Sequence, residues 1–261
     1  MENLDLTGRK ALVIGVANEH SLAWSAARHF RAAGAEIALT WLNDKARPFV
    51  EPLAREVDAP IAMACDVREA GALEAVFDAI RARWGRLDLL FHAVAWMRKE
   101  DLHSRLTDCS AEGFAEAMVV SCHSLIRMAH LAEPLMDRGG SVTTLSFLGA
   151  ERVVDHYNVM GPVKAALEAS VRYLAHELGP RKIRVNAISA GPVMTRAASG
   201  LEHFDALLAA SAQAAPLHRR IEADEVGRTA LALASGVMGA VTGEVLHVDA
   251  GLHVEGMVPL V

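Results

Sequence analysis

The chain contains 261 residues, of which 52% are hydrophobic and 22% are charged, and its formal net charge is −6. This length suits one large α/β domain or two small ones, and the apolar fraction excludes a disordered chain. The acidic balance disfavours a surface for nucleic acid or anionic membrane, so we expect neither kind of partner.

Seven short apolar runs alternate with segments of helical periodicity along the chain. The predicted strands are residues 10–15, 36–41, 61–67, 87–95, 141–147, 183–189 and 243–249. The predicted helices are residues 21–34, 44–57, 69–84, 111–136, 157–178 and 222–235. Most strands are continuous apolar runs, which indicates a parallel sheet covered by helices on both faces. We therefore predict one doubly wound, Rossmann-type α/β domain over residues 1–261, with a seven-stranded parallel sheet and ligands at the carboxyl ends of its strands.

Cysteine and histidine usage argues against disulfide and metal sites. The three cysteines are widely spaced and form no Cys-x-x-Cys pair, so we expect a reduced, cytoplasmic protein. The twelve histidines show neither H-E-x-x-H nor finger spacing, and His123 and His130 suit the packing of a helix face. We expect no metal site. Residues 1–9 lack a signal-peptide layout, and no apolar run reaches the roughly 18 residues of a membrane span.

The first predicted strand ends in a turn suited to a phosphate group. A dinucleotide fold needs close backbone approach and a helix N-terminus at this point. The G-x-G-x-x-G string is absent, but Gly15 can supply the tight turn and Ala23 allows close helix packing. Ser21 can donate to a phosphate, or it can simply cap the helix.

The third and fourth predicted strands also end in residues suited to a nucleotide. Asp66, followed by Val67, can accept from an adenine amino group, or it can be the N-cap of the next helix. The fourth strand ends in Ala93, Val94 and Ala95, whose small side chains allow a ribose to approach the backbone.

Tyr157 and Lys164 stand seven residues apart, near the start of the helix predicted over 157–178. Seven residues are about two helical turns, so the two side chains are expected on one face. A tyrosine hydroxyl can stabilise a developing oxyanion, and a lysine ammonium can hold a cofactor hydroxyl. For the pair alone, an amphipathic helix with a half-buried tyrosine and a solvated lysine is the simpler explanation.

Together these segments resemble the enoyl-acyl-carrier-protein reductases, the divergent branch of the short-chain dehydrogenase/reductase family that completes the fatty-acid elongation cycle. The resemblance rests on Gly15, Ser21 and Ala23, on Asp66-Val67, on residues 145–152, on Tyr157 with Lys164, and on residues 184–192. It continues nearly end to end, through residues 216–220 and 243–249. The Tyr-x6-Lys spacing within it is a strong signal, whereas any single piece would be weak.

The resemblance implies reduction of the carbon–carbon double bond of a trans-2-enoyl thioester on acyl carrier protein, by a cytoplasmic homotetramer. It implies that Tyr157 stabilises the enolate oxygen and that Lys164 binds the ribose hydroxyls of the nicotinamide nucleotide. Ordinary short-chain dehydrogenases carry Tyr-x3-Lys, and neither Tyr157 nor Tyr173 has a lysine four residues later. A ketone reductase of the ordinary kind is thereby disfavoured.

The same resemblance assigns further positions to cofactor and substrate. The cofactor-binding residues it implies are Gly15, Ser21, Leu22, Leu42, Asp66, Val67, Val94, Lys164, Val193 and Thr195. The substrate-binding residues it implies are Met97, Phe147, Tyr157 and Ala197. Residues 195–215 are expected to form a substrate lid, although their small apolar side chains also suit a surface helix. Arg196, Arg219 and Arg220 can attract an acidic carrier protein or can be ordinary solvated arginines.

Three positions depart from the family pattern. Phe147 stands where many members carry tyrosine, and it cannot donate a hydrogen bond. Residues 93–95 replace the usual Ser-Ile-Gly. Pro162 lies between Tyr157 and Lys164, and because proline is tolerated only in the first helical turn, we expect the regular helix to start nearer Asn158 than Ser146.

The end of the second predicted strand bears on the choice of cofactor. An acidic residue there selects the free ribose of NADH, and an arginine accepts the extra phosphate of NADPH. Leu42 and Asn43 are neither, which favours NADH, although Lys45 and Arg47 lie nearby.

Two alternative functions stay open on the sequence alone. The same fold and cofactor can serve a specialised enone or carbonyl, which Phe147 and the altered end of the fourth strand motivate. A catalytically idle nucleotide-binding regulator is the other, and the intact Tyr157 and Lys164 argue against it.

Overall fold

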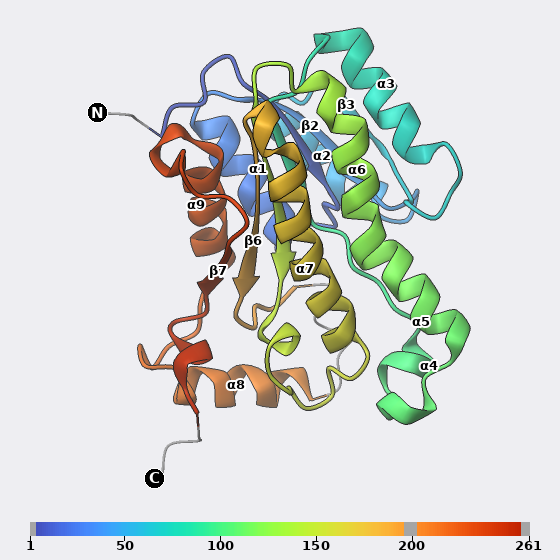
Figure 1. Cartoon of the computed structure of the whole chain (residues 1–261), viewed down its shortest axis with the longest axis vertical. Helices are drawn as coiled ribbons and strands as arrows, with labels where there is room; N and C mark the ends of the chain where they lie inside the picture. The colour runs from blue at the N-terminus through green and yellow to red at the C-terminus, as the bar shows by residue number, and fades with distance from the viewer. Residues whose placement is uncertain (1–3, 196–202, 257–261) are drawn as a thin grey trace.

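A computed structural model describes residues 4–195 and 203–256 of the chain (Figure 1). Its seven described strands form one parallel sheet in the order β3-β2-β1-β4-β5-β6-β7. The strands are β1 Lys10–Ile14, β2 Glu36–Trp41, β3 Ile61–Ala64, β4 Leu89–His92, β5 Gly140–Ser146, β6 Ile183–Ala190 and β7 Val245–Val248. The predicted fold class is confirmed.

Nine α-helices are described around this sheet. They are α1 Leu22–Ala32, α2 Arg47–Glu56, α3 Ala72–Trp84, α4 Lys99–Leu102, α5 Ala111–Met118, α6 Ser124–Ala132, α7 Met160–Leu178, α8 Phe204–Ala214 and α9 Ala223–Ala234. Among these described helices, none is both long and apolar enough to span a membrane.

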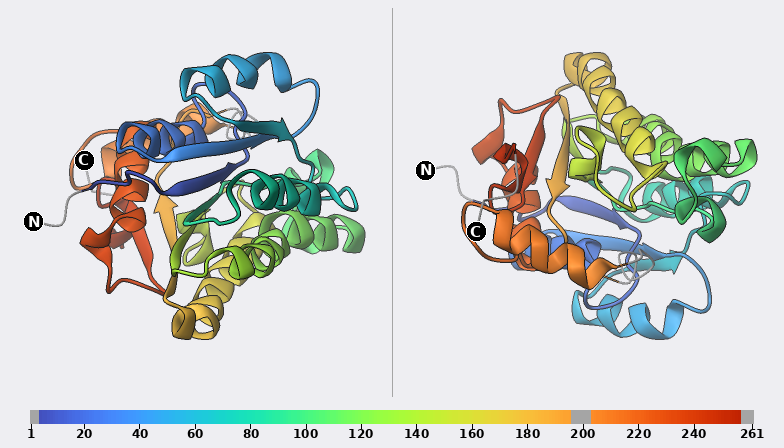
Figure 2. Two further views of the ribbon diagram at one scale, coloured as in Figure 1. Left: turned by 90° about the horizontal axis from the view of Figure 1, so that it is seen from above. Right: turned by 90° about the horizontal axis from the view of Figure 1, so that it is seen from below.

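The side chains of β1 explain why the sheet is covered on both faces. Leu12 and Ile14 are fully buried in one core cluster, which also contains residues of α3, α6 and α7. Ala11 and Val13 are fully buried in a second cluster, with residues of α1, α2 and α9. Because successive side chains of a strand point to opposite faces, this continuous apolar run requires a helical layer on each side. Figure 2 shows the sheet between these two layers.

The strand order places the site. The chain moves outward from β1 through β2 to β3, and then returns to add β4 on the other side of β1. Ligands of open α/β sheets bind beyond the carboxyl ends of the strands at this point of reversal. The loops after β1 and β4 therefore face one another across the crevice.

The helix predicted over 111–136 differs from the observed one in its middle. A π-helical segment, Val119–His123, separates α5 from α6, and a short 3₁₀ turn, Glu133–Leu135, ends the element. Wide turns of this kind inside helices are often found at functional sites. The short helix α4 was not predicted at all, because its four residues show no helical period.

The start of α7 confirms one expectation and corrects another. Pro162 is the third residue of α7, inside the first turn, where a proline leaves no intrahelical hydrogen bond unmade. Tyr157, however, lies in the turn that precedes α7, so the prediction that it shares a helix face with Lys164 is wrong.

Candidate active site

A cavity of about 230 Å³ lies at the carboxyl ends of the strands, bordered by the segments that follow β4, β5 and β6. Its lining is Leu22, Ala95, Trp96, Met97, Leu102, Leu145, Ser146, Phe147, Tyr157, Met160, Lys164, Ala190, Gly191, Pro192, Val193, Thr195 and Phe204. Most of these side chains are apolar, and the polar exceptions include Tyr157 and Lys164. Such a lining suits an apolar chain with one reactive polar end.

Tyr157 is held by the turn before α7 and not by the helix itself. Its neighbours His156 and Asn158 both have left-handed backbones, with φ of 63° and 43°. The Asn158 amide donates to the carbonyl of Leu102 at 2.7 Å, which ties the turn to α4. Left-handed non-glycine residues cost free energy and cluster at functional sites. This local strain aims the Tyr157 side chain into the cavity.

The Tyr157 ring packs against two residues that follow β5. The centroid of Phe147 lies 4.7 Å away, with the ring planes inclined by 59°. Gly149 also lies close, since an added Cβ there would overlap the tyrosine ring. Burial raises the pKa of the Tyr157 hydroxyl well above its ordinary value, and Glu168 adds to that rise. The hydroxyl is therefore a proton-bearing donor at neutral pH.

Lys164 is buried, with 6% of its surface exposed, so the explanation as a solvated lysine is wrong. Its ammonium donates to the carbonyl of Leu145 at 2.7 Å, which joins α7 to the end of β5. Burial lowers the pKa of Lys164 to about 8, while Glu168 and Cys122 oppose that effect. Lys164 thus carries its charge inside the cavity wall under mildly acidic and neutral conditions.

Glu168 and Ser146 complete the floor beneath Lys164, and neither was singled out from the sequence. Glu168 is buried one helical turn after Lys164, and its carboxylate accepts a hydrogen bond from the hydroxyl of Ser146. Burial raises the pKa of Glu168. The i, i+4 spacing of Lys164 and Glu168 on one face of a helix was the available signal.

His92 is a further buried polar residue, which the sequence placed at the end of the fourth strand without a polar role. It ends β4, and its ring nitrogens lie 2.8 Å from the hydroxyl of Thr144 and 2.8 Å from that of Ser124. Burial, together with the charge on Lys164, lowers the pKa of His92 to about 3. A neutral imidazole thus links the ends of β4 and β5 to α6.

The turn after β1 has the tight backbone that a phosphate group requires. Gly15 has φ of 98°, and a Cβ there would collide with the carbonyl oxygen of Ala93. Ser21 caps α1, since its hydroxyl accepts from the amide of Trp24 at 3.4 Å. The same hydroxyl donates to the carbonyl of Asn18 at 2.7 Å. Close packing and a capped helix N-terminus fit a dinucleotide phosphate.

Asp66 follows β3, and the interpretation as a helix N-cap is wrong. Gly71 occupies the N-cap of α3, five residues later. The Asp66 carboxylate instead accepts from the backbone amide of Arg68 at 3.0 Å and from its guanidinium at 2.6 Å. The hydrogen bonds from Arg68 lower the pKa of Asp66. The hydrogen bonds from Arg68 thus fix the position of the Asp66 carboxylate, which is ionised, just after β3.

The predicted site residues fall into two groups. Those that line the cavity are Leu22, Met97, Phe147, Tyr157, Lys164, Val193 and Thr195. Those that do not line it but follow the carboxyl ends of β1 to β4 are Gly15, Ser21, Leu42, Asp66, Val67 and Val94. Ala197 and Arg196 lie outside the described residues. Over residues 4–195 and 203–256, no group of three or more His, Cys, Asp or Glu side chains is placed to hold a metal ion.

A doubly wound parallel sheet with Tyr157 and a buried Lys164 in one cavity at its strand ends defines a Rossmann-type reductase. Residues 15–253 match the family model described as enoyl-(acyl carrier protein) reductase. The chain belongs to that family.

Curated relatives and solved structures agree with this assignment. Enoyl-acyl-carrier-protein reductase (NADH) 1 of Rhizobium meliloti is 49% identical over 252 residues, which cover 97% of this chain and 93% of the relative. The NADH-dependent relative from a Nostoc species is 46% identical over 257 residues, covering 97% and 100%. The Anaplasma phagocytophilum reductase in complex with NAD is 47% identical, with a TM-score of 0.94 and coverage of 100% and 99%. The Bacillus cereus reductase with NADP+ and an indole naphthyridinone is 41% identical, with a TM-score of 0.94 and coverage of 98% and 100%.

Proposed function

We propose that the protein reduces the carbon–carbon double bond of a trans-2-enoyl thioester, carried by acyl carrier protein, with hydride from NADH. The observation that carries this proposal is the convergence of Tyr157 and the buried Lys164 on one apolar cavity at the end of β5. The relatives named NADH-dependent enoyl-acyl-carrier-protein reductases support the substrate and the cofactor.

Tyr157 is the proposed hydrogen-bond donor to the thioester oxygen. Addition of hydride to the β-carbon moves negative charge to that oxygen, and a donor aimed there stabilises the enolate. The raised pKa keeps the proton on the Tyr157 hydroxyl, so the residue donates a hydrogen bond and does not ionise. Phe147 has no hydroxyl, so its contribution is to pack against Tyr157 and the acyl chain.

Lys164 has two proposed roles, both electrostatic. Its ammonium binds the ribose hydroxyls of the nicotinamide nucleotide, and its charge attracts the developing enolate. The hydrogen bond to the carbonyl of Leu145 fixes the ammonium at the end of β5. The ammonium makes this one hydrogen bond among the described residues, so two further donor positions suit a pair of hydroxyls.

The cofactor is assigned to the crevice beside this cavity. When bound, the nicotinamide supplies the hydride. Gly15, Ser21 and Thr195 are proposed to bind the pyrophosphate. Asp66 and Val67 are proposed to bind the adenine, and Val94 to contact the ribose. Leu22 and Val193 are proposed to border the nicotinamide. Leu42, 44% exposed after β2, supports NADH because it offers no charge to a ribose phosphate.

The acyl chain and its carrier are assigned to the outer side of the cavity. Met97 and Phe147 are proposed to contact the chain, and residues 195–215, which include α8, to form the lid. Phe204 at the start of α8 lines the cavity, which supports the lid. Arg219 already forms an ion pair with Glu225 at 2.8 Å. Its charge is therefore less available to attract an acidic carrier protein than the charge of an unpaired arginine would be.

We also propose a cytoplasmic homotetramer. Exposed apolar side chains on the long helical elements support an assembly, namely Phe114, Val119, Ile126 and Tyr173. The free thiols Cys65, Cys109 and Cys122 support a reducing compartment. Light scattering on the purified protein tests the assembly, and a monomer at micromolar concentration would refute it.

The deciding assay follows the loss of NADH absorbance with crotonyl and longer trans-2-enoyl thioesters, on acyl carrier protein and on coenzyme A. We expect turnover, and we expect Tyr157→Phe to lower kcat by about 10²-fold or more. Absence of turnover on every enoyl thioester would remove the proposed function. Turnover of ketones or specialised enones alone would favour the other substrate class. Parallel rates with NADPH test the cofactor, and a large preference for NADPH would reverse that choice.

A further inference from the structure

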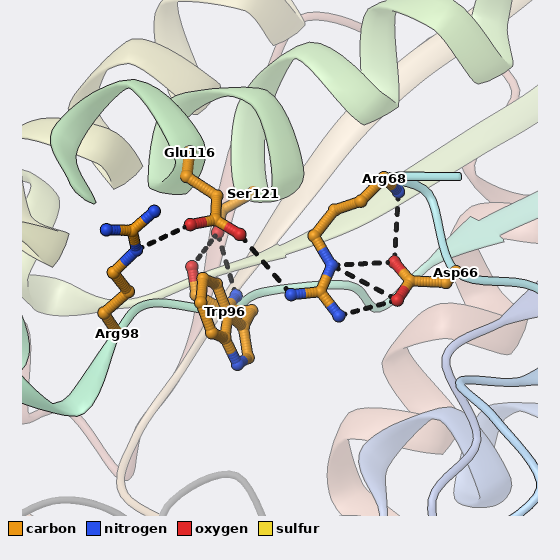
Figure 3. A network of polar contacts seen from close by, with 6 residues as sticks. All are labelled: Asp66, Arg68, Trp96, Arg98, Glu116 and Ser121. Carbon is orange, nitrogen blue, oxygen red and sulfur yellow. Dashed lines mark hydrogen bonds and ion pairs between the residues drawn. The ribbon is translucent and has the colours of Figure 1, made fainter. Parts of the chain in front are cut away.

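Four charged side chains of alternating sign form an ion-pair network beside the proposed adenine end of the site (Figure 3). Asp66 pairs with Arg68 at 2.6 Å, Arg68 with Glu116 at 3.4 Å, and Glu116 with Arg98 at 2.8 Å. Asp66 and Arg68 come from the loop between β3 and α3, Glu116 from α5 and Arg98 from the segment before α4. The ion-pair network therefore joins segments that are far apart in the sequence.

Arg68 is the central residue of this ion-pair network, because it pairs with both Asp66 and Glu116. Its Nε donates to Oδ1 of Asp66 at 3.0 Å and its Nη2 to Oδ2 at 2.6 Å, so the guanidinium grips both carboxylate oxygens. A bidentate pair fixes the plane of a carboxylate as well as its position. The side chains of Asp66 and Arg68 are 17% and 37% exposed, so water screens this pair only in part. The hydrogen bonds to Asp66 raise the pKa of Arg68 above its ordinary value.

The same guanidinium also lies against the wall of the cavity. The Cζ atom of Arg68 is 4.9 Å from the centre of the Trp96 ring, within the range of a cation–π contact. The backbone of Trp96 is fixed by Ser121, whose hydroxyl accepts from the Trp96 amide at 3.0 Å. Trp96 and its neighbour Met97 both line the cavity.

We propose that Arg68 is a positioning residue that holds, with one guanidinium, both the Asp66 carboxylate for the adenine and the Trp96 wall of the acyl cavity. The inference rests on the proposed function, because the adenine and acyl assignments come from it. Arg68 uses only part of the Asp66 carboxylate, which has about four lone-pair directions, so an acceptor stays available in a fixed orientation. Cofactor and acyl chain thus share one side chain as a common support.

The test compares two cofactors that differ in the adenosine half. NADH contains adenine, whereas reduced nicotinamide mononucleotide contains only the nicotinamide ribose phosphate. In Arg68→Met the Asp66 carboxylate loses the guanidinium and keeps only the hydrogen bond from the backbone amide of residue 68, so its plane is no longer fixed and we expect the Kd of NADH to rise about tenfold. The Kd of reduced nicotinamide mononucleotide should stay within about twofold of wild type, because that ligand does not reach Asp66.

The acyl side is tested with the KM of a crotonyl thioester in the same variant. Loss of the guanidinium lets the Trp96 ring shift, so we expect this KM to rise about threefold or more. An unchanged KM would overturn the assignment of Arg68 to the cavity wall.

Two further variants separate positioning from charge and from general stability. Arg68→Lys keeps the charge, but its ammonium cannot form the bidentate pair with both carboxylate oxygens of Asp66. This variant should therefore recover only part of the NADH affinity. Arg127→Met is the matched control, since it removes a partly exposed ion pair between α6 and Glu74 of α3, away from the cavity. It should leave the Kd of both cofactors unchanged.

The cofactor titrations need no turnover, so they stay readable even if no enoyl thioester is reduced. Equal weakening of both cofactors in Arg68→Met, or weakening of neither, would overturn the inference. Full recovery of NADH affinity in Arg68→Lys would overturn it as well, because charge alone would then suffice.

Discussion

The rings of Phe147 and Tyr157 lie 4.7 Å apart with their planes inclined by 59°. Phe147 directly follows β5, whereas Tyr157 belongs to the turn before α7. The two rings join the strand end to the strained turn, so the position of the Tyr157 hydroxyl depends on packing as well as on backbone conformation. Aromatic pairs in such tilted arrangements contribute about 1 kcal/mol beyond their burial.

Gly149 is the position at which this packing is most easily disturbed. A Cβ there would lie 2.8 Å from Cε1 of Tyr157, so Gly149→Ala must displace the ring. We expect kcat to fall by about 10²-fold, because a displaced hydroxyl no longer meets the thioester oxygen. The Kd of NADH should change little. Gly179→Ala is the control, since among the described residues no atom other than those of its chain neighbours and its own helix lies within 4 Å of the Cβ it adds. Wild-type kcat in Gly149→Ala would contradict a catalytic position for the ring.

Phe147→Tyr tests whether the missing hydroxyl matters. The ring contact with Tyr157 is retained and the added oxygen has the cavity beside it, so we expect kcat within about threefold of wild type. Phe147→Ala removes the ring, and we expect a loss of stability of about 2 kcal/mol and a clear fall in kcat. Steady-state kinetics and chemical denaturation of both variants give the comparison. A gain of tenfold or more in Phe147→Tyr would show that the hydroxyl takes part in the reaction.

The pKa of Lys164, lowered to about 8, predicts how activity depends on pH. Below pH 8 the ammonium is charged and active, so the rate should fall as pH rises through about 8. Stability should change in the opposite direction. Between pH 8 and the ordinary lysine value of 10.5 the unfolded chain binds more protons than the folded one, so stability rises with pH. Lys164→Met should lack this rise, which denaturant titrations at pH 8 and pH 10 would measure. An unchanged rise would show that other groups cause it.

His92 predicts a loss of stability in acid. Burial lowers its pKa from 6.5 to about 3. Between pH 6.5 and pH 3, His92 is therefore protonated in the unfolded chain but neutral in the folded chain. Stability is then lost by up to about 1.4 kcal/mol per pH unit from this residue. His92→Gln should reduce the slope between pH 6.5 and pH 5. His176→Gln, at an exposed position on α7, should leave the slope unchanged. Equal slopes in wild type and His92→Gln would refute the assignment.

The sequence predicts the layers of this fold better than the order of its strands. The run Leu12, Val13 and Ile14 is apolar throughout because it faces two helical layers, and that pattern is visible without any structure. The pairing of β1 with β4, by contrast, depends on contacts between residues far apart in the chain, which no local period records. The sequence therefore predicts seven parallel strands without their order, which the structure provides.

The proposed catalytic pair, Tyr157 and Lys164, shows a similar division. The seven-residue spacing identified Tyr157 and Lys164, although the helical geometry used to join them was incorrect. They converge because two left-handed residues, His156 and Asn158, turn the chain before α7. Positive φ at histidine and asparagine is set by tertiary contacts such as the hydrogen bond from Asn158 to Leu102. Arg68 and Glu116 were likewise invisible, because 48 residues separate them.

The wide turn Val119–His123, between α5 and α6, holds one residue more than a regular α-helical turn. Its hydrogen bonds join residues five apart, so the extra residue is absorbed within the turn and the helices on either side keep their relative rotation. Glu116, before the wide turn, faces the arginines at the surface, while Ser124, after it, faces the buried His92. Deletion of one residue there would therefore convert the wide turn into a regular α-helical turn and leave Glu116 facing both arginines and Ser124 facing His92. An inserted or deleted residue elsewhere in α5 or α6 would instead rotate one of these contacts by about 100° relative to the other.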